Sequence, residues 1–186
     1  MTLTSKLLQM TIEKIIKVGC LASIFYILSS FTGCGVYKFS DASVDPNVKS
    51  IKIEQIQNVA PYLNPQLSPN LTDRIRQKFN NQTKISLTNN DNAHWILQGQ
   101  IVDYAVSTVG VTSTNGQSQS SVNRLTVSVK IILTKQNENK APEEYLATRQ
   151  FDFPATQSLQ QAETGLLDEM VRNLTDEIFN RIFSGW

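Results

Sequence analysis

The sequence predicts an α+β fold, a two-layer sandwich in which two helices pack on one face of a mostly antiparallel sheet of four to five strands with a long β-hairpin. Several stretches alternate apolar with polar residues, which is typical of strands. Two other stretches carry apolar residues every three to four positions, which is typical of amphipathic helices. Their order is strand, helix, strand, long hairpin, strand, helix, without an internal repeat.

The first predicted strand covers residues 48–56, where isoleucines alternate with charged residues. Prolines then exclude regular structure until a helix can begin. Ser68 is the predicted N-cap because Pro69 follows it at the first helical position. The helix is expected to end at about Asn80. Its apolar stripe comprises Leu71, Ile75 and Phe79.

A long hairpin is predicted after a short strand at residues 85–87. Its first strand begins at His94, and the alternation of apolar residues changes phase near Gly99, which predicts a β-bulge in that neighbourhood. A polar turn is expected around Asn115 and Gly116. Strands of about a dozen residues reach about 40 Å, so the hairpin should project beyond the helices. A contact surface and an ordinary polar loop both fit this projection. The second strand presents Leu125, Val127, Val129, Ile131 and Leu133 on one face.

A last strand and a last helix complete the predicted domain. Pro154 ends the strand, whose residues of one face share a period of two: Tyr145, Ala147, Arg149, Phe151 and Phe153. Ser158 and Gln161 have the spacing of a capping box, so the helix should begin near Ser158. Its polar face is acidic, unlike that of a membrane-surface helix, and we expect it to cover the sheet. The apolar stripe comprises Leu167, Met170, Val171, Leu174, Ile178 and Ile182.

Composition excludes several classes of function. The chain of 186 residues suits one domain, and its formal net charge of +1 gives no support to a nucleic-acid partner. His94 is the only histidine, so a metal site would lack soft ligands, and we expect no metal. There is no glycine-rich phosphate loop and no nucleophile elbow. We therefore expect no enzymatic activity and no catalytic residues.

The N-terminal residues have the order of a secretory signal peptide. Lys14 and Lys17 precede an uncharged run at residues 18–31, and small residues follow. A membrane-spanning helix needs about 20 apolar residues, so this run is short for a permanent anchor. The motif "FTGC" resembles a bacterial lipobox, in which the cysteine, here Cys34, is acylated after cleavage. Phe31 departs from the usual leucine of that motif.

Three alternatives for Cys34 are a disulfide, a catalytic thiol and an uncleaved signal anchor. A disulfide needs a second cysteine, and Cys20 would leave with the signal peptide. A catalytic cysteine is usually activated by a histidine base, and the chain has only one histidine, His94, so a catalytic thiol is disfavoured. We therefore expect lipidation, with no cofactor beyond the covalent diacylglycerol and N-acyl chain on Cys34. Each buried methylene contributes about 0.8 kcal/mol, so several chains hold firmly.

The predicted organisation has three parts. Residues 1–33 form a signal peptide that starts at Met1 or Met10, residues 34–47 carry the lipidated cysteine and a tether, and residues 48–186 form one domain.

Basic residues on the second hairpin strand are candidates for lipid binding. Arg124, Lys130 and Lys135 lie on one strand, and Lys130 stands between two apolar residues. Such side chains can hold the phosphates of an amphipathic lipid by charge-assisted hydrogen bonds. The preferred interpretation is simpler, because outward lysines commonly keep a sheet surface soluble.

Four stretches of the mature chain resemble the LptE family of lipopolysaccharide-assembly lipoproteins, in the form typical of the Bacteroidetes. They are "CGVYKFSDASVDPNVKSIKIEQIQNVAPYLNPQLS", "ILQGQIVDY", "NRLTVSVKI" and "LTDEIFNRIFSGW". Together they extend the likeness over nearly all of the chain from Cys34 to Trp186.

The resemblance implies a lipoprotein anchored in the outer membrane on its periplasmic side. Such a protein acts as plug and assembly partner of the β-barrel translocon LptD and helps deliver lipopolysaccharide, which is itself an expected binding partner. Gly35 is not the aspartate that retains lipoproteins in the inner membrane, so outer-membrane sorting is allowed. The alternative is a periplasm-facing lipoprotein that binds lipid through Arg124 and Lys130, or scaffolds another envelope complex, without a barrel.

Overall fold

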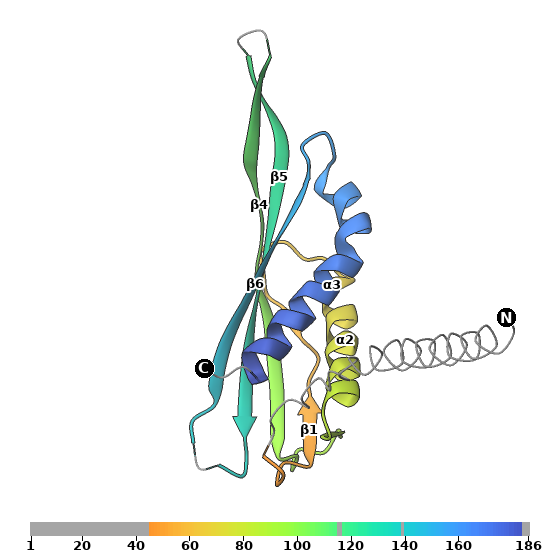
Figure 1. Cartoon of the computed structure of the whole chain (residues 1–186), viewed down its shortest axis with the longest axis vertical. Helices are drawn as coiled ribbons and strands as arrows, with labels where there is room; N and C mark the ends of the chain where they lie inside the picture. Colours follow the sequence, from red (N-terminus) through yellow and green to blue (C-terminus); the bar gives the residue numbers. More distant parts are fainter. Residues whose placement is uncertain (1–44, 115–116, 139, 184–186) are drawn as a thin grey trace, which may run out of the picture. The chain divides into compact units, whose positions relative to one another are not determined.

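A computed structural model describes residues 45–114, 117–138 and 140–183 of the chain. The predicted signal peptide, Cys34, most of the tether and the turn at Asn115 and Gly116 lie outside the described residues. The described residues have an α+β fold with a long hairpin, as the sequence predicted (Figure 1).

The sheet has six strands and is mixed. Its order is β3-β1-β4-β5-β6, and β2 also pairs with β4. The long strands β4, β5 and β6 are antiparallel, whereas the short strands pair in parallel. The strands are β1 (Ser50–Ile53), β2 (Gln57–Asn58), β3 (Ser86–Leu87), β4 (Trp95–Thr114), β5 (Gln117–Lys135) and β6 (Glu143–Pro154).

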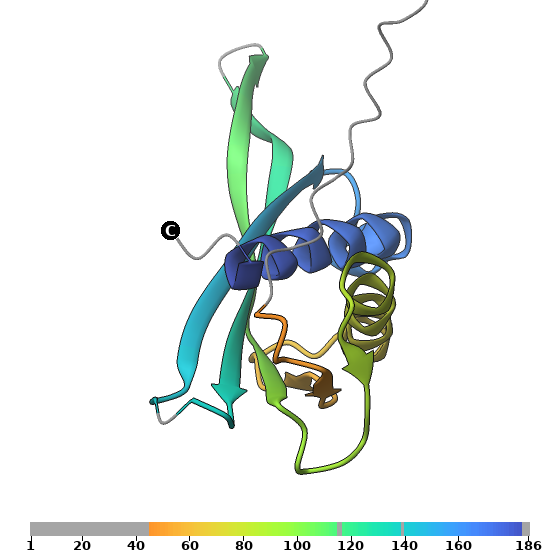
Figure 2. The same cartoon turned by 60° about the horizontal axis from the view of Figure 1, so that its bottom comes forward.

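Two helices, α2 (Leu67–Gln82) and α3 (Leu159–Phe183), cover one face of this sheet (Figure 2). The apolar stripes predicted for them are buried, with the exception that Leu167 is partly exposed. The apolar face of β5 is fully buried beneath the helices, so helices and sheet share one core. The predicted two-layer sandwich is confirmed, with six strands.

The two helices begin in different ways. At α3 the capping box is present, because the Ser158 N–H donates to Gln161 Oε1 at 3.0 Å and the Gln161 N–H donates to Ser158 Oγ at 3.3 Å. Ser68, in contrast, is not an N-cap, since α2 starts at Leu67. The buried Asn64 accepts the N–H of Leu67 at 3.2 Å, while the Ser68 hydroxyl donates to the Ile56 carbonyl.

The predicted irregularity in β4 lies just after Gly99. The register with β5 shifts between Ile101 and Asp103, which places both Ile101 and Tyr104 in the core. Gly99 itself serves close packing. A Cβ there would stand 2.9 Å from Ile131 Cδ1 and 2.9 Å from Ile56 Cγ1.

A tyrosine pair ties the loop after β2 to the sheet and to α3. Tyr62 and Tyr104 stack with ring centroids 5.3 Å apart. Tyr104 donates to Glu163 on α3 at 2.5 Å, and Tyr62 donates to the same carboxylate at 3.2 Å. Burial, followed by the hydrogen bond to Glu163, raises the pKa of Tyr104 well above its ordinary value.

Candidate functional site

Of the site residues predicted from the sequence, Cys34 lies outside the described residues. Its lipidation therefore remains a prediction. None of the helices in the described part of the chain is long and apolar enough to cross a membrane.

Arg124 and Lys130 both lie on β5 and both pair with carboxylates of β6. The Arg124 guanidinium donates two hydrogen bonds to Asp152, at 2.7 and 2.8 Å. These bonds lower the pKa of Asp152. The Lys130 ammonium lies 2.8 Å from Glu144. A lipid phosphate at either cation would have to displace a carboxylate that the sheet already holds beside it.

Lys135, the third basic residue of that strand, also pairs with a carboxylate. Its ammonium donates to Glu143 at 2.6 Å and lies 5.6 Å from the centre of the Trp95 ring. The arrangement fits the interpretation that these side chains keep a sheet surface soluble, and the two exposed pairs, those of Arg124 and Lys130, contribute little to stability.

His94 has a structural contact. The ring nitrogen Nδ1 of His94 lies 2.7 Å from the Ser50 hydroxyl, and the backbone N–H of His94 donates to the same oxygen at 3.2 Å. The contact joins the start of β4 to β1. The described residues contain no group of three or more histidines, cysteines or carboxylates that could hold a metal ion.

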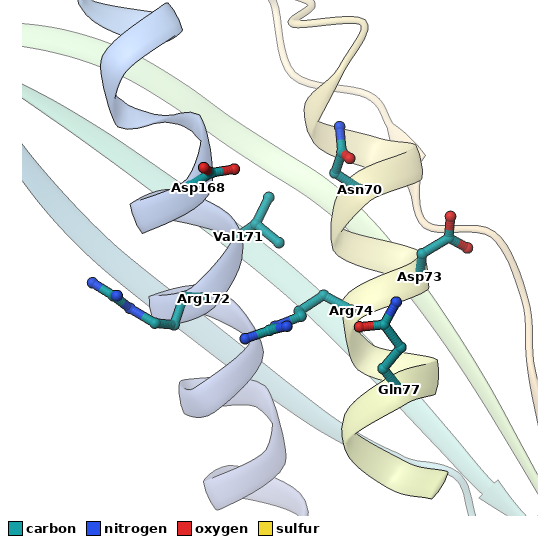
Figure 3. Close-up of a pocket in the computed structure, with 7 residues that line it drawn as sticks. All are labelled: Asn70, Asp73, Arg74, Gln77, Asp168, Val171 and Arg172. Atoms are coloured by element: carbon teal, nitrogen blue, oxygen red, sulfur yellow. The ribbon is translucent and has the colours of Figure 1, made fainter. Parts of the chain in front are cut away.

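An open groove between α2 and α3 is a better place for an anion than the strand cations. Its volume is about 460 Å³ (Figure 3). Arg74 extends from α2 toward α3, whereas Arg172 leaves the far side of α3 in this view. Within the described ranges, neither arginine makes an ion pair or a hydrogen bond. The lining residues are Asn70, Asp73, Arg74, Gln77, Asp168, Val171 and Arg172.

The groove suits binding by charge and hydrogen bonding. A guanidinium presents a planar fork of donors that matches a phosphate or a carboxylate. A phosphate between the helices would meet Arg74 directly, and Arg172 after rotation of its exposed side chain. The lining carboxylate of Asp73 is already engaged by Arg76 at 3.3 Å. Among the described residues that line the groove, the charged side chains without an ion-pair partner are therefore Arg74, Arg172 and Asp168.

Sequence reasoning missed this groove because neither arginine stands out along the chain. Each flanks the buried stripe of its own helix, next to Ile75 on α2 and next to Val171 on α3. The signal lies in the packing of two helices far apart in sequence, which the periodicity of one helix does not reveal.

Solved structures that are similar to this chain include bacterial lipoproteins. A minor lipoprotein from Acinetobacter baumannii is 15% identical with a TM-score of 0.48, and the alignment covers 74% of this chain and 94% of that one. The rare lipoprotein B from Shewanella oneidensis is 13% identical with a TM-score of 0.42, over 72% and 95% of the two chains. A putative neuraminyllactose-binding hemagglutinin homolog from Helicobacter pylori is 7% identical with a TM-score of 0.49, over 73% and 83%.

The likeness that decides the family is in the sequence. No curated protein matches the chain. The LptE family model, described as lipopolysaccharide-assembly, matches residues 48–182, which is most of the chain. That span includes both helices except the last residue of α3, and every strand of the sheet. The chain therefore belongs to the LptE family, whose members are non-enzymatic lipoproteins of lipopolysaccharide assembly, as the resemblance implied.

Proposed function

We propose that this protein is held in the outer membrane by lipid on Cys34, faces the periplasm, and acts as plug and assembly partner of the LptD β-barrel in delivering lipopolysaccharide to the cell surface. The family match over residues 48–182 carries the proposal. A polar, largely ion-paired exterior also suits the polar lumen of a large barrel.

Affinity isolation from gently solubilised envelopes tests the partnership. A tagged chain should recover a large outer-membrane barrel that mass spectrometry identifies as LptD, and depletion of the chain should leave that barrel misassembled. Cys34→Ala should leave the protein unacylated and outside the membrane fraction. Recovery of the folded, acylated chain without any barrel after crosslinking in cells would refute the partnership.

A second candidate function is direct contact with the phosphates of lipopolysaccharide in the groove between α2 and α3. The observation that favours it is the pair of arginines, Arg74 and Arg172, that have no partner among the described residues. Binding at this exposed site should weaken with ionic strength, since salt screens exposed charges over about 10 Å at 0.1 M.

Two double variants with equal loss of charge separate the groove from the strand cations. Arg74→Gln with Arg172→Gln should weaken the binding of fluorescent lipopolysaccharide by the purified domain, whereas Arg124→Gln with Lys130→Gln should change it less. A larger loss of binding in the Arg124 and Lys130 variant than in the Arg74 and Arg172 variant would favour the strand cations as the lipid contact. Equal binding by both variants and the parent would remove direct recognition of phosphate from the groove.

A further inference from the structure

One edge of β4 is unpaired over the half of the strand that lies beyond the short strands. The pairing with β2 ends at Asn58, opposite Ile101, and the Val59 N–H donates to the Ile101 carbonyl at 3.0 Å. From Asp103 to Thr108, β4 pairs with β5 without a break in register. Among the described residues no strand pairs with the opposite edge of this segment, where the hairpin rises beyond the short strands (Figure 1).

The direction of the backbone groups follows from the register. The Ile101 carbonyl points away from β5, because it accepts from Val59. Backbone groups alternate along a strand, and the extra residue at the register shift moves this alternation by one position. The N–H and C=O groups of Tyr104, Val106 and Thr108 therefore point to the free edge.

This edge lacks the usual side-chain protection against pairing. Exposed edges are normally guarded by charged side chains, prolines, bulges or very short strands. Residues 104–123 contain no charged residue and no proline. Val106 and Val109 are 41% and 44% exposed. Register shifts occur only at the ends of the segment, after Ile101 and after Thr108.

The other outer strands of the sheet are guarded. Strand β3 has two residues, which leaves little edge to pair. Strand β6 carries Glu144, Arg149 and Asp152, and it ends at Pro154. An unguarded edge on β4 is therefore a local feature of the hairpin and not a property of the whole sheet.

We propose that residues 104–108 of β4 are a docking edge, which takes up an uncharged, extended segment of the barrel partner as an additional β-strand. The proposal rests on the proposed function for the identity of that partner. Main-chain hydrogen bonds supply the attachment in such strand addition, and side chains at alternate positions select the segment. A charged segment would lose solvation against Val106 without gaining an opposite charge.

The size of the edge favours an enveloping partner over a second copy of the chain. A regular stretch of five residues is about 17 Å long, and strands lie about 4.8 Å apart. That strip is narrow beside the roughly 1,200–2,000 Å² that stable interfaces bury. A partner that surrounds the domain buries further surface elsewhere, whereas pairing of two copies along this edge alone does not.

Site-specific photocrosslinking tests the docking edge. A benzoylphenylalanine at Val106 should crosslink to the barrel in cells, and the same residue at the exposed Leu146 on β6 is the comparison position. Val106→Pro removes an edge N–H and should lower the recovered barrel about tenfold. Val106→Thr keeps the N–H and should recover as much barrel as the parent.

The possible outcomes separate the docking edge from the proposed function. The docking edge alone would be overturned if the parent recovers the barrel, the Val106 position gives no crosslink to it, and Val106→Pro recovers as much barrel as the parent. Crosslinks between two copies at Val106 would overturn it in favour of self-pairing. Absence of a barrel from the parent protein would overturn both proposals. If Val106→Pro proves unfolded by circular dichroism, Val106→Lys, which charges the edge and keeps the backbone, decides by the same tenfold criterion.

Discussion

Replacement of Gly99 by alanine should destabilise the domain, although the same change in an open site does the opposite. In a compatible site Gly→Ala stabilises by about 0.4–1 kcal/mol, because it restricts the unfolded chain. At Gly99 the new Cβ would stand 2.9 Å from the side chains of Ile131 and Ile56, both fully buried. Overpacking of this kind costs about 1–3 kcal/mol, so we expect a net loss of stability.

Equilibrium unfolding in urea measures the effect, with a matched glycine as control. Gly165 in α3 has no atom within 4 Å of a built Cβ, so Gly165→Ala should stabilise by about 0.5–1 kcal/mol. Ile131→Val removes Cδ1 and should cost about 0.5–1.5 kcal/mol alone. In the double variant with Gly99→Ala the loss should be smaller than the sum by at least about 0.5 kcal/mol. A Gly99→Ala protein as stable as the parent, or strictly additive losses, would refute the close contact.

Two further predictions concern the core and alkaline pH. Leu174→Ala, on the fully buried face of α3, should lower the free energy of unfolding by about 2–5 kcal/mol. Leu146 is 55% exposed on β6, so Leu146→Ala should change that free energy by no more than about 0.5 kcal/mol. Equal losses in urea unfolding would contradict the assigned faces. Burial, followed by a hydrogen bond to a carboxylate, raises the pKa of Tyr145 to about 12 from an ordinary value of 10.0, so its contribution is complete below about pH 10 and disappears as pH rises toward 12. Tyr145→Phe should therefore flatten the fall of the urea midpoint between about pH 10 and 12, and an unchanged slope would count against it.

The sequence predicted those elements whose own periodicity decides their place. Strand β5 has an apolar residue at every second position from Leu125 to Leu133, and α3 combines a capping box with one apolar stripe, so both follow from local patterns. The short strands β2 and β3 have two residues each, and their parallel pairing depends on how α2 returns the chain to the sheet. The predicted start of α2 at Ser68 is wrong for a similar reason, because the N–H groups of Gln66 and Leu67 donate to Asn64, which lies in the loop before the helix.

The candidate site was harder to predict because charge pairing depends on register. Arg124 stands directly opposite Asp152, a relation fixed by the alignment of β5 with β6. Lys130 stands opposite Leu146 and reaches diagonally to Glu144. The basic residues of β5 were visible in the sequence, but their partners follow from a register that one strand does not contain.

The hairpin and the body of the domain differ in charge, and therefore in how much solvation each would lose on burial. In the described part of the chain, cations and carboxylates pair on the body, as Lys78 does with Asp176 and Arg149 with Glu177. Such pairs are only partly exposed, and they are costly to bury further with imperfect geometry. Residues 104–123 carry no charge, so a partner can remove them from water without stripping an ion of its solvent. The hairpin is therefore the part of the domain that enters a protein environment at least cost, which is what the docking edge on β4 requires.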